Sequence, residues 1–436
     1  MPAISDSNHL SPDVVFVGGG PVGLWTAIQT KLLTNKNILI VEKYLEYKRA
    51  DIRLNIDSSS FAGVPDYEPL KALIQKWGGK VVPIKEMEEA LAKCAHDLGI
   101  KILKGNAADP KLLQQEYPTA KLFIGADGAK SAMRRELFGD AYKFNTPLQY
   151  IVQVQYQIKT PEAEKGGFLH NLKGSVSSYT MQKFAGHLIT QIIRPQDNGQ
   201  SQVTLRIFVT KNTYEAMADA VFSNPYYFET DLDKVPPLLR KTLIKWWGAQ
   251  KSQEIIGDMA KTNKITVIPL ASYAAKEPFK MVEKVGDPDD SVGVGLAGDA
   301  SQGYPFFRAI NNGLLLGTRL AQCTGRAFEA LKKEEEQNGA PDGPEKQRRA
   351  ALFASKFTSY SRYSTVRAYI ERIRALVKNF FIALSSLWLK LIDYAPIEPI
   401  KLSRAEQKAA ARRGAAIWQR LTGVKSVEQE SKQLSA

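Results

Sequence analysis

The sequence predicts an α/β protein that combines a mostly parallel sheet, an inserted antiparallel sheet and a helical C-terminal region. Three patterns predict this class. Residues 13–43 follow the order strand, glycine turn, helix, strand, and their short apolar strands suit a parallel sheet covered on both faces. Residues 146–275 alternate apolar and polar positions, as in an antiparallel sheet with one wetted face. Residues beyond 345 have helical spacing and a basic charge.

Further elements follow in chain order. Residues 85–105 predict a helix that leads into a short strand, and residues 122–128 predict a strand that ends in a glycine turn. Within the middle part, residues 212–224 predict a helix. The stretch VGVGLAGDA at 292–300 is again typical of a buried strand with a Gly–Asp turn, and a long helix is expected over 313–335.

These elements predict four parts of the chain. A polar segment with glycine and proline at 334–347 separates the long helix from the C-terminal region. The expected parts are the first portion of a Rossmann-like domain (1–145), an antiparallel-sheet substrate domain (146–285), the second portion of the Rossmann-like domain (286–335) and a basic helical region (345–436).

Composition indicates the cellular compartment of the protein and bears on whether it binds a metal. The two cysteines, Cys94 and Cys323, are too few for a disulfide scaffold in 436 residues and suit a reducing compartment, where both are expected as buried thiols. The four histidines lie far apart without ligand spacing, so no metal site is expected. The first residues lack a secretory pattern, and no apolar run reaches the roughly 18 residues that span a bilayer. A cytoplasmic protein is expected, with peripheral membrane attachment as the alternative.

The net charge of +14 is concentrated at the C-terminal end, where residues 341–436 hold 18 Lys and Arg against 8 Asp and Glu. Residues 377–392 are apolar enough for a buried helix or for an amphipathic helix in a membrane interface, and the sequence leaves both open. The basic surroundings predict an anionic partner, either a membrane surface or an acidic protein. Nucleic acid is the least favoured partner, because the interleaved tyrosines match no RNA-binding module.

The first motif that carries chemistry is Gly18, Gly20 and Gly23, a G-x-G-x-x-G that follows a predicted strand and opens a predicted helix. The first glycine permits a tight turn, the second lets the backbone approach a pyrophosphate, and the third lets helix and strand pack closely. Glu42 ends the next predicted strand, where an acid would accept hydrogen bonds from ribose hydroxyls. The motif predicts dinucleotide binding without deciding between NAD and FAD.

Two later motifs resemble those of the flavoprotein monooxygenases with the p-hydroxybenzoate hydroxylase fold. GADGAKSAMRR at 125–135 resembles the family's D-G motif, with Asp127, Gly128, Ser131 and Arg134 on its pattern. LAGDA at 296–300, with Gly298 and Asp299, resembles the family's second FAD fingerprint. The resemblance implies that the Rossmann-like domain binds FAD and that all three glycine turns face it.

The N-terminal part is most similar to the MICAL-type monooxygenase domain. VEKYLEYKRADIRLNI at 41–56 resembles the stretch after the ribose-binding acid, with Arg49 at the matching arginine. Lys85 stands where MICAL-type domains carry an arginine near FAD, which keeps the charge and loses the bidentate fork. The resemblance implies that Arg49, Lys85 and Arg134 contact FAD phosphates or the incoming nicotinamide dinucleotide.

The loop after the second fingerprint departs from the family pattern P-x-x-G-x-G-x-N. It keeps Pro305, Asn311 and Gly313, so Asn311 is expected at the cofactor, but bulky residues over 306–309 replace the small ones. Pro305 and Arg308 are the candidate catalytic residues. Arg308 would pair with a substrate carboxylate or the flavin N1 region, and a surface salt bridge is an equally good interpretation.

The resemblance implies an FAD-dependent monooxygenase that is reduced by NAD(P)H and oxygenates a small molecule or a protein side chain through a C4a-hydroperoxyflavin. The alternatives are an FAD-dependent reductase or oxidase without oxygen insertion, and a flavin-binding interaction protein whose basic tail binds a partner. Four side chains on predicted middle strands are candidates for the substrate face, although core packing explains them as well: Tyr150, Tyr156, Tyr179 and His187.

Overall fold

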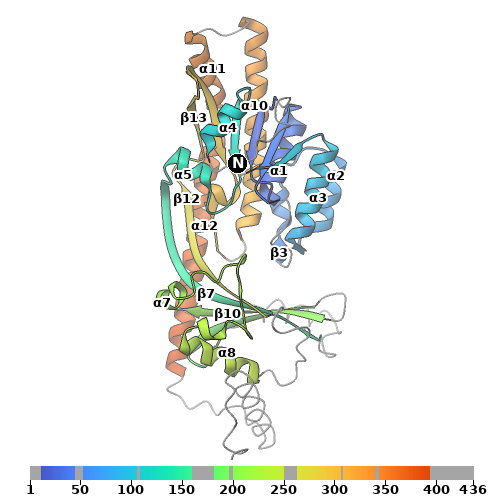
Figure 1. The fold of residues 1–436 in the computed structure, drawn as a ribbon. Coiled ribbons are helices and arrows are strands. Elements are labelled where there is room, and N and C mark those ends of the chain that lie inside the picture. The colour runs from blue at the N-terminus through green and yellow to red at the C-terminus, as the bar shows by residue number, and fades with distance from the viewer. Residues whose placement is uncertain are drawn as a thin grey trace, which may run out of the picture. The chain divides into compact units, whose positions relative to one another are not determined.

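A computed structural model describes residues 11–44, 53–105, 109–159, 181–195, 200–249, 263–305, 308–338 and 343–392 (Figure 1). The chain divides into two compact units. The first comprises residues 1–147 and 271–376, and the second comprises residues 148–270 and 377–436. Three long elements run through both ranges: β7 (Tyr142–Lys159), β12 (Lys264–Ala275) and α12 (Thr358–Ile392).

The first unit contains a six-stranded sheet in the order β13-β14-β6-β1-β2-β5. Its strands are β1 (Val14–Val17), β2 (Ile38–Glu42), β5 (Lys101–Lys104), β6 (Leu122–Gly125), β13 (Phe279–Lys284) and β14 (Asp287–Leu296). All neighbours pair in parallel except β13, which is antiparallel to β14 at the edge. The predicted α/β class and mostly parallel sheet are confirmed, and the four residues of β1 are buried because both faces are covered.

The pairing register brings the predicted glycine turns together. Val17, Gly125 and Leu296 are register partners across β1, β6 and β14, and Val17 pairs with Val41 of β2 on the other side. Because these strands are parallel, the turns that follow them all lie at one edge of the sheet. Three motifs separated by more than a hundred residues each therefore meet in space.

Helices cover this sheet and complete the first unit. They are α1 (Pro21–Thr34), α2 (Glu68–Trp77), α3 (Ile84–Asp97), α4 (Pro110–Glu116), α5 (Ala132–Phe138), α10 (Arg308–Asn338) and α11 (Gly343–Ser355). A two-stranded ribbon of β3 (Arg53–Ile56) and β4 (Lys80–Pro83) flanks them, with the short η2 (Ser58–Phe61), η5 (Gly298–Ala300) and β15 (Gln302–Gly303). Cys94 and Cys323 are buried free thiols, as predicted.

Close contact between α1 and α10 depends on two glycines. A Cβ at Gly313 would lie 2.6 Å from Cγ2 of Val22, and a Cβ at Gly317 would overlap Oγ1 of Thr26. Trp25 crosses the same interface and donates its Nε1–H to the carbonyl oxygen of Leu314 at 3.0 Å. The two glycines thus let the helix after the third turn pack directly on the helix after the first.

The second sheet is antiparallel, as predicted, and runs β11-β12-β7-β10-β9-β8. Its remaining strands are β8 (Met181–Phe184), β9 (His187–Pro195), β10 (Gln200–Val209) and β11 (Tyr226–Tyr227), and β15 pairs with the end of β12. Alternate residues of β7, among them Val152 and Val154, are buried in one cluster with Trp246 and Trp247 of α8 (Pro237–Ala249). Over 155–158 half-buried and buried residues alternate as predicted, but Ile151 and Gln153 on the opposite face of β7 are buried too, so the predicted wetted face is absent at those two positions.

The helix predicted over 212–224 is wrong beyond its first turn. The helix there, α7, spans only Lys211–Glu215, followed by turns and the short η4 (Leu232–Lys234). Val267 of β12 donates its backbone N–H to the carbonyl oxygen of Ala220, so the backbone that a longer helix would have used bonds to the sheet. Tertiary pairing outweighs helix propensity in this segment.

The C-terminal region is helical as far as the structure describes it, over α11 and the long α12. Within the described residues, every helix is too short or too polar to cross a membrane.

Gly317→Ala should lower the free energy of unfolding by about 2 kcal/mol, because the added methyl group meets the Thr26 hydroxyl in a packed interface. Urea unfolding followed by circular dichroism measures this. The double variant Thr26→Ala/Gly317→Ala is the control, since removing the hydroxyl should restore most of the loss; equal instability of single and double variants would contradict this account.

Candidate functional site

The first glycine turn contains three glycines with three different reasons to be glycine. Gly18 has φ +106°, and a Cβ there would lie 2.5 Å from the carbonyl oxygen of Ala126. A Cβ at Gly23 would overlap the carbonyl oxygen of Gly18, so this glycine lets α1 pack against the turn. Gly20 differs, because the nearest protein atom to its added Cβ is Oε1 of Glu88 at 4.0 Å. The described residues therefore leave room beside Gly20 at the start of α1.

Glu42 presents its carboxylate next to this turn. Oε2 accepts the backbone N–H of Gly19 at 2.5 Å, and Oε1 accepts that of Tyr44 at 2.7 Å. The two backbone donors hold the carboxylate in one orientation, and each oxygen keeps a further lone pair. Glu42 can thus accept hydroxyl hydrogen bonds in the way predicted for a ribose-binding acid.

The second turn places a buried carboxylate at the same edge of the sheet. Oδ2 of Asp127 accepts the backbone N–H of Ala132 at 2.6 Å, at the start of α5. Oδ1 of Asp127 is buried and has no hydrogen-bond partner among the described residues. A buried carboxylate oxygen without a donor is costly, so a bound hydroxyl or water is expected to satisfy it. Ser131 caps α5 by accepting the N–H of Arg134 at 2.9 Å.

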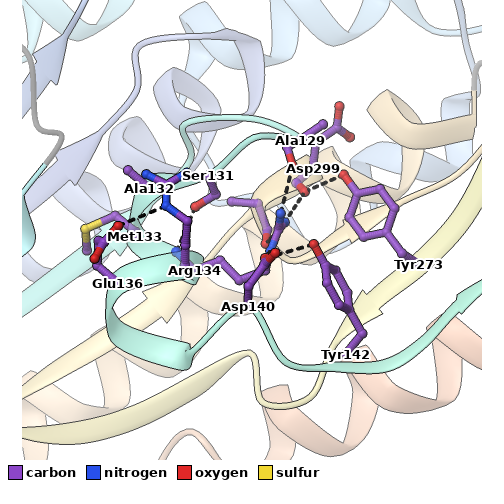
Figure 2. Close-up of polar contacts among 12 residues, drawn as sticks. Ala129, Ser131, Ala132, Met133, Arg134, Glu136, Asp140, Tyr142, Tyr273 and Asp299 are labelled. Carbon is purple, nitrogen blue, oxygen red and sulfur yellow. Dashed lines mark hydrogen bonds and ion pairs between the residues drawn. The ribbon is translucent and has the colours of Figure 1, made fainter. Parts of the chain in front are cut away.

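Arg134 joins the second turn to the third (Figure 2). Its Nη2 donates to the carbonyl oxygen of Ala129 at 2.8 Å, and its Nη1 donates to that of Ala300 at 3.0 Å, with a longer 3.4 Å contact to that of Asp299. Nε donates to Oδ1 of Asp140 at 2.8 Å. Most of its five N–H donors are therefore occupied by protein oxygens.

Two tyrosines complete the surroundings of this guanidinium. The ring centroids of Tyr142 and Tyr273 lie 5.0 Å and 5.4 Å from Cζ of Arg134, within cation–π range. The Tyr273 hydroxyl donates to the carbonyl oxygen of Asp299 at 2.8 Å. Figure 2 shows the Asp299 carboxylate directed away from Arg134. The hydrogen bond from Arg134 lowers the pKa of Asp140. The geometry supports a positioning role for Arg134, holding two turns together, more than the cofactor contact predicted for it.

The third turn continues into α10 through residues that bind other parts of the protein. Oδ1 of Asn311 accepts the N–H of Asp57 and the hydroxyl of Ser60, each at 2.9 Å, and Nδ2 donates to the carbonyl oxygen of Asn55. Three of its hydrogen bonds thus hold β3 and the segment after it, leaving little capacity for the predicted cofactor contact. Pro305 is buried just before this helix.

Arg308 forms a bidentate ion pair with Glu371 of α12. Its Nε and Nη2 contact the two carboxylate oxygens, the second at 2.9 Å, and the Glu371 side chain is fully buried. Arg374 donates to the same carboxylate at 2.6 Å, and these arginines lower the pKa of Glu371 against the effect of its burial. Of the two interpretations of Arg308, the salt bridge is observed, and it is partly buried.

The remaining predicted residues are more scattered. Lys85 is exposed, and its Nζ lies 3.6 Å from Oε1 of Glu89 on the same helix. Tyr156 belongs to the core of the second unit, where its hydroxyl accepts the Nε1–H of Trp246. Tyr150 packs on Tyr214, and Nδ1 of His187 lies 2.9 Å from Oγ1 of Thr242, where burial lowers the histidine pKa. Arg49, Tyr179, Phe306 and Phe307 lie outside the described residues.

Sequence reasoning missed Glu88, which is buried on α3 and faces the open side of Gly20. A signal for it existed, because Glu88 occupies the apolar face of that helix with Ile84, Met87 and Leu91. Among the described residues no cluster of three or more His, Cys, Asp or Glu could hold a metal ion. The edge offers backbone N–H groups at the start of α1 and the carboxylates of Glu42 and Asp127, which can bind the diphosphate and the hydroxyls of a nucleotide.

Comparisons with known proteins give structural neighbours only, because no family model and no curated protein matches the chain. The chain is similar to CabE, an aromatic hydroxylase from angucycline biosynthesis, at 12 % identity and a TM-score of 0.48, covering 95 % of this chain and 76 % of that one. It is also similar to p-nitrophenol 4-monooxygenase PnpA from Pseudomonas putida DLL-E4. The sequence identity is 14 % and the TM-score is 0.45, and the match covers 95 % of this chain and 99 % of that one.

A third neighbour is aklavinone-11 hydroxylase, solved with FAD and aklavinone, at 14 % identity and a TM-score of 0.45, covering 75 % of this chain and 66 % of that one. These three neighbours are two hydroxylases and a monooxygenase. With identities and scores this low, the similarity carries no conclusion about the activity of this chain, which rests on its own residues.

Arg134→Lys should lower the free energy of unfolding by about 2–4 kcal/mol, because lysine keeps the charge but cannot reach the separate oxygens that the guanidinium bonds. Thermal and urea unfolding measure the loss. Arg135→Lys is the matched control, since Arg135 is exposed, forms an ion pair with the exposed side chain of neighbouring Glu136 and should change stability little. Equal stability of the two variants would contradict the positioning role.

Proposed function

We propose that the edge of the parallel sheet binds FAD. The observation that carries the proposal is that three turns and Glu42 meet there, and that the nearest atom of the described residues to a Cβ added at Gly20 is Oε1 of Glu88 at 4.0 Å. The first-turn N–H groups of α1 would bind the diphosphate, aided by the helix dipole. Glu42 would accept the ribose hydroxyls, and Oδ1 of Asp127 would accept a hydroxyl that satisfies its buried lone pair.

The activity we propose is that of an FAD-dependent monooxygenase that uses NAD(P)H. The support is the sequence resemblance at all three turns. Bound FAD would supply hydride acceptance from NAD(P)H and activation of dioxygen. The chain's own residues would bind and orient it, and Arg134 would keep the second and third turns in place. The substrate would be a small molecule or a protein side chain, the second because of the MICAL-type resemblance at residues 41–56.

One observation favours a second candidate, a reductase or oxidase without oxygen insertion. The loop where the resemblance expects small residues carries Arg308, and its ion pair with buried Glu371 fixes a bulky charged side chain at the start of α10. Stopped-flow spectroscopy with NADPH in air separates the candidates. An oxygenated flavin intermediate and an oxygenated product support the monooxygenase, whereas NADPH oxidation with stoichiometric hydrogen peroxide supports the second candidate.

Gly20→Ala should weaken FAD binding by at least about tenfold while leaving the thermal stability of the FAD-free protein unchanged, because the added methyl group meets only the ligand space. Titration with FAD, followed by visible absorbance and quenching of flavin fluorescence, measures this. Gly18→Ala is the contrasting variant: its positive φ and its contact with Ala126 should cost more than about 2 kcal/mol of stability. A wild-type protein that takes up no FAD would refute the proposal.

Glu88→Gln should strengthen FAD binding by about tenfold, because it replaces a carboxylate near the expected diphosphate with a neutral amide of the same shape. The same titration measures the change. Glu89→Gln is the control, since that side chain is exposed and pairs with Lys85. Weaker binding by Glu88→Gln would show that this carboxylate accepts a hydrogen bond from the nucleotide.

A further inference from the structure

The long helix α12 is apolar on two opposite sides. On one side Tyr360, Ala368 and Ala375 are buried. On the other, an apolar stripe is exposed, although a helix that only covers a core would be polar there. The stripe, with residues three or four apart, consists of Val366, Tyr369, Ile370, Ile373, Leu376, Val377, Phe380, Phe381 and Leu384.

The exposure of this apolar stripe is large for its residue types. Phe380, Ile373 and Phe381 are 63 %, 61 % and 58 % exposed. With 1.5 Å of rise per residue, the stripe extends for roughly 27 Å along the helix. Single exposed leucines are common on protein surfaces. A continuous apolar stripe of this length is typical of a surface that contacts a membrane or another molecule. For residues up to Leu384, these exposures also exclude burial in the core, one of the two interpretations that the sequence left open.

The exposed charges that α12 itself carries along the apolar stripe have one sign. Between residues 358 and 384 the sequence contains four arginines and one lysine, and its single acid is Glu371. That acid is fully buried and neutralised by Arg308 and Arg374, so it contributes no negative charge to the surface. Arg362 is exposed ahead of the stripe and Arg374 is exposed beside it, whereas Lys378 is half-buried.

We propose that the apolar stripe of α12 lies in the surface of an anionic lipid bilayer, parallel to the membrane plane. Aromatic and aliphatic side chains would enter the boundary between headgroups and acyl chains, while the exposed arginines Arg362 and Arg374 would contact lipid phosphates. A second copy of the chain fits less well, because two such helices would bring basic flanks together without an exposed acid between them. An apolar groove of a protein would require no basic flank.

Flotation of the full-length protein with vesicles tests the proposal. Vesicles of phosphatidylcholine with phosphatidylserine should bind the protein, and phosphatidylcholine alone should bind it weakly. The double variant Phe380→Ser/Phe381→Ser should weaken vesicle binding by about tenfold for each phenyl ring that it removes from the membrane interface. Arg362→Gln should weaken binding to anionic vesicles by about fivefold, and high salt should weaken it too.

Leu238→Ser is the matched control, because Leu238 on α8 is 64 % exposed and lies outside the apolar stripe; its binding should equal that of the wild type. Thermal unfolding and the far-ultraviolet spectrum show whether each variant is folded. Absence of binding to anionic vesicles, or equal binding by Phe380→Ser/Phe381→Ser, would overturn the proposal. So would a dimer in sedimentation velocity that this double variant dissolves, because the stripe would then contact a second copy.

Discussion

The carboxyl ends of β1, β6 and β14 lie in one row of a parallel sheet, and the candidate site depends on that row. Parallel pairing points every strand the same way, so the turns that follow strands distant in sequence leave the sheet at a shared edge. A shift of one residue in either pairing would move a turn by about 3.3 Å and turn the strand's side chains over. The cover of helices on both faces, which buries β1 completely, holds the register.

Two sets of contacts then keep the turns in place. The glycines of α10 let that helix lie against α1, so the helices that follow the first and third turns form one layer. Arg134 joins the second turn to the third through the carbonyl oxygens of Ala129 and Ala300, the second of which is buried. A buried arginine is expensive unless its donors are satisfied, and here Asp140 and two aromatic rings balance the charge. The motif arginine thus contributes to the geometry of the edge.

Electrostatics at this edge is mixed. The start of α1 favours an anion, whereas Glu42, Glu88 and Asp127 bring carboxylates. Hydroxyl-rich parts of a nucleotide suit carboxylates, and its diphosphate suits backbone N–H groups, so the two kinds of group suit different parts of one ligand. A similar separation occurs on α12, where Glu371 is buried beside arginines and the exposed positions from Arg362 to Phe381 are apolar or basic.

The sequence by itself determined the α/β class, the order of the main strands and helices, and the three glycine turns, because these depend on local periodicity and on backbone conformations that neighbouring residues dictate. Only the tertiary structure decided what the motif side chains contact. Arg134 bonds oxygens 165 and 166 residues away, Asn311 bonds residues more than 250 away, and Arg308 finds Glu371 on another helix. A long polar side chain bonds whatever the fold brings within reach, and that neighbourhood has no local signature. For the same reason the exposure of the stripe on α12 could not be predicted: an apolar helix face shows the same periodicity whether it is covered or bare.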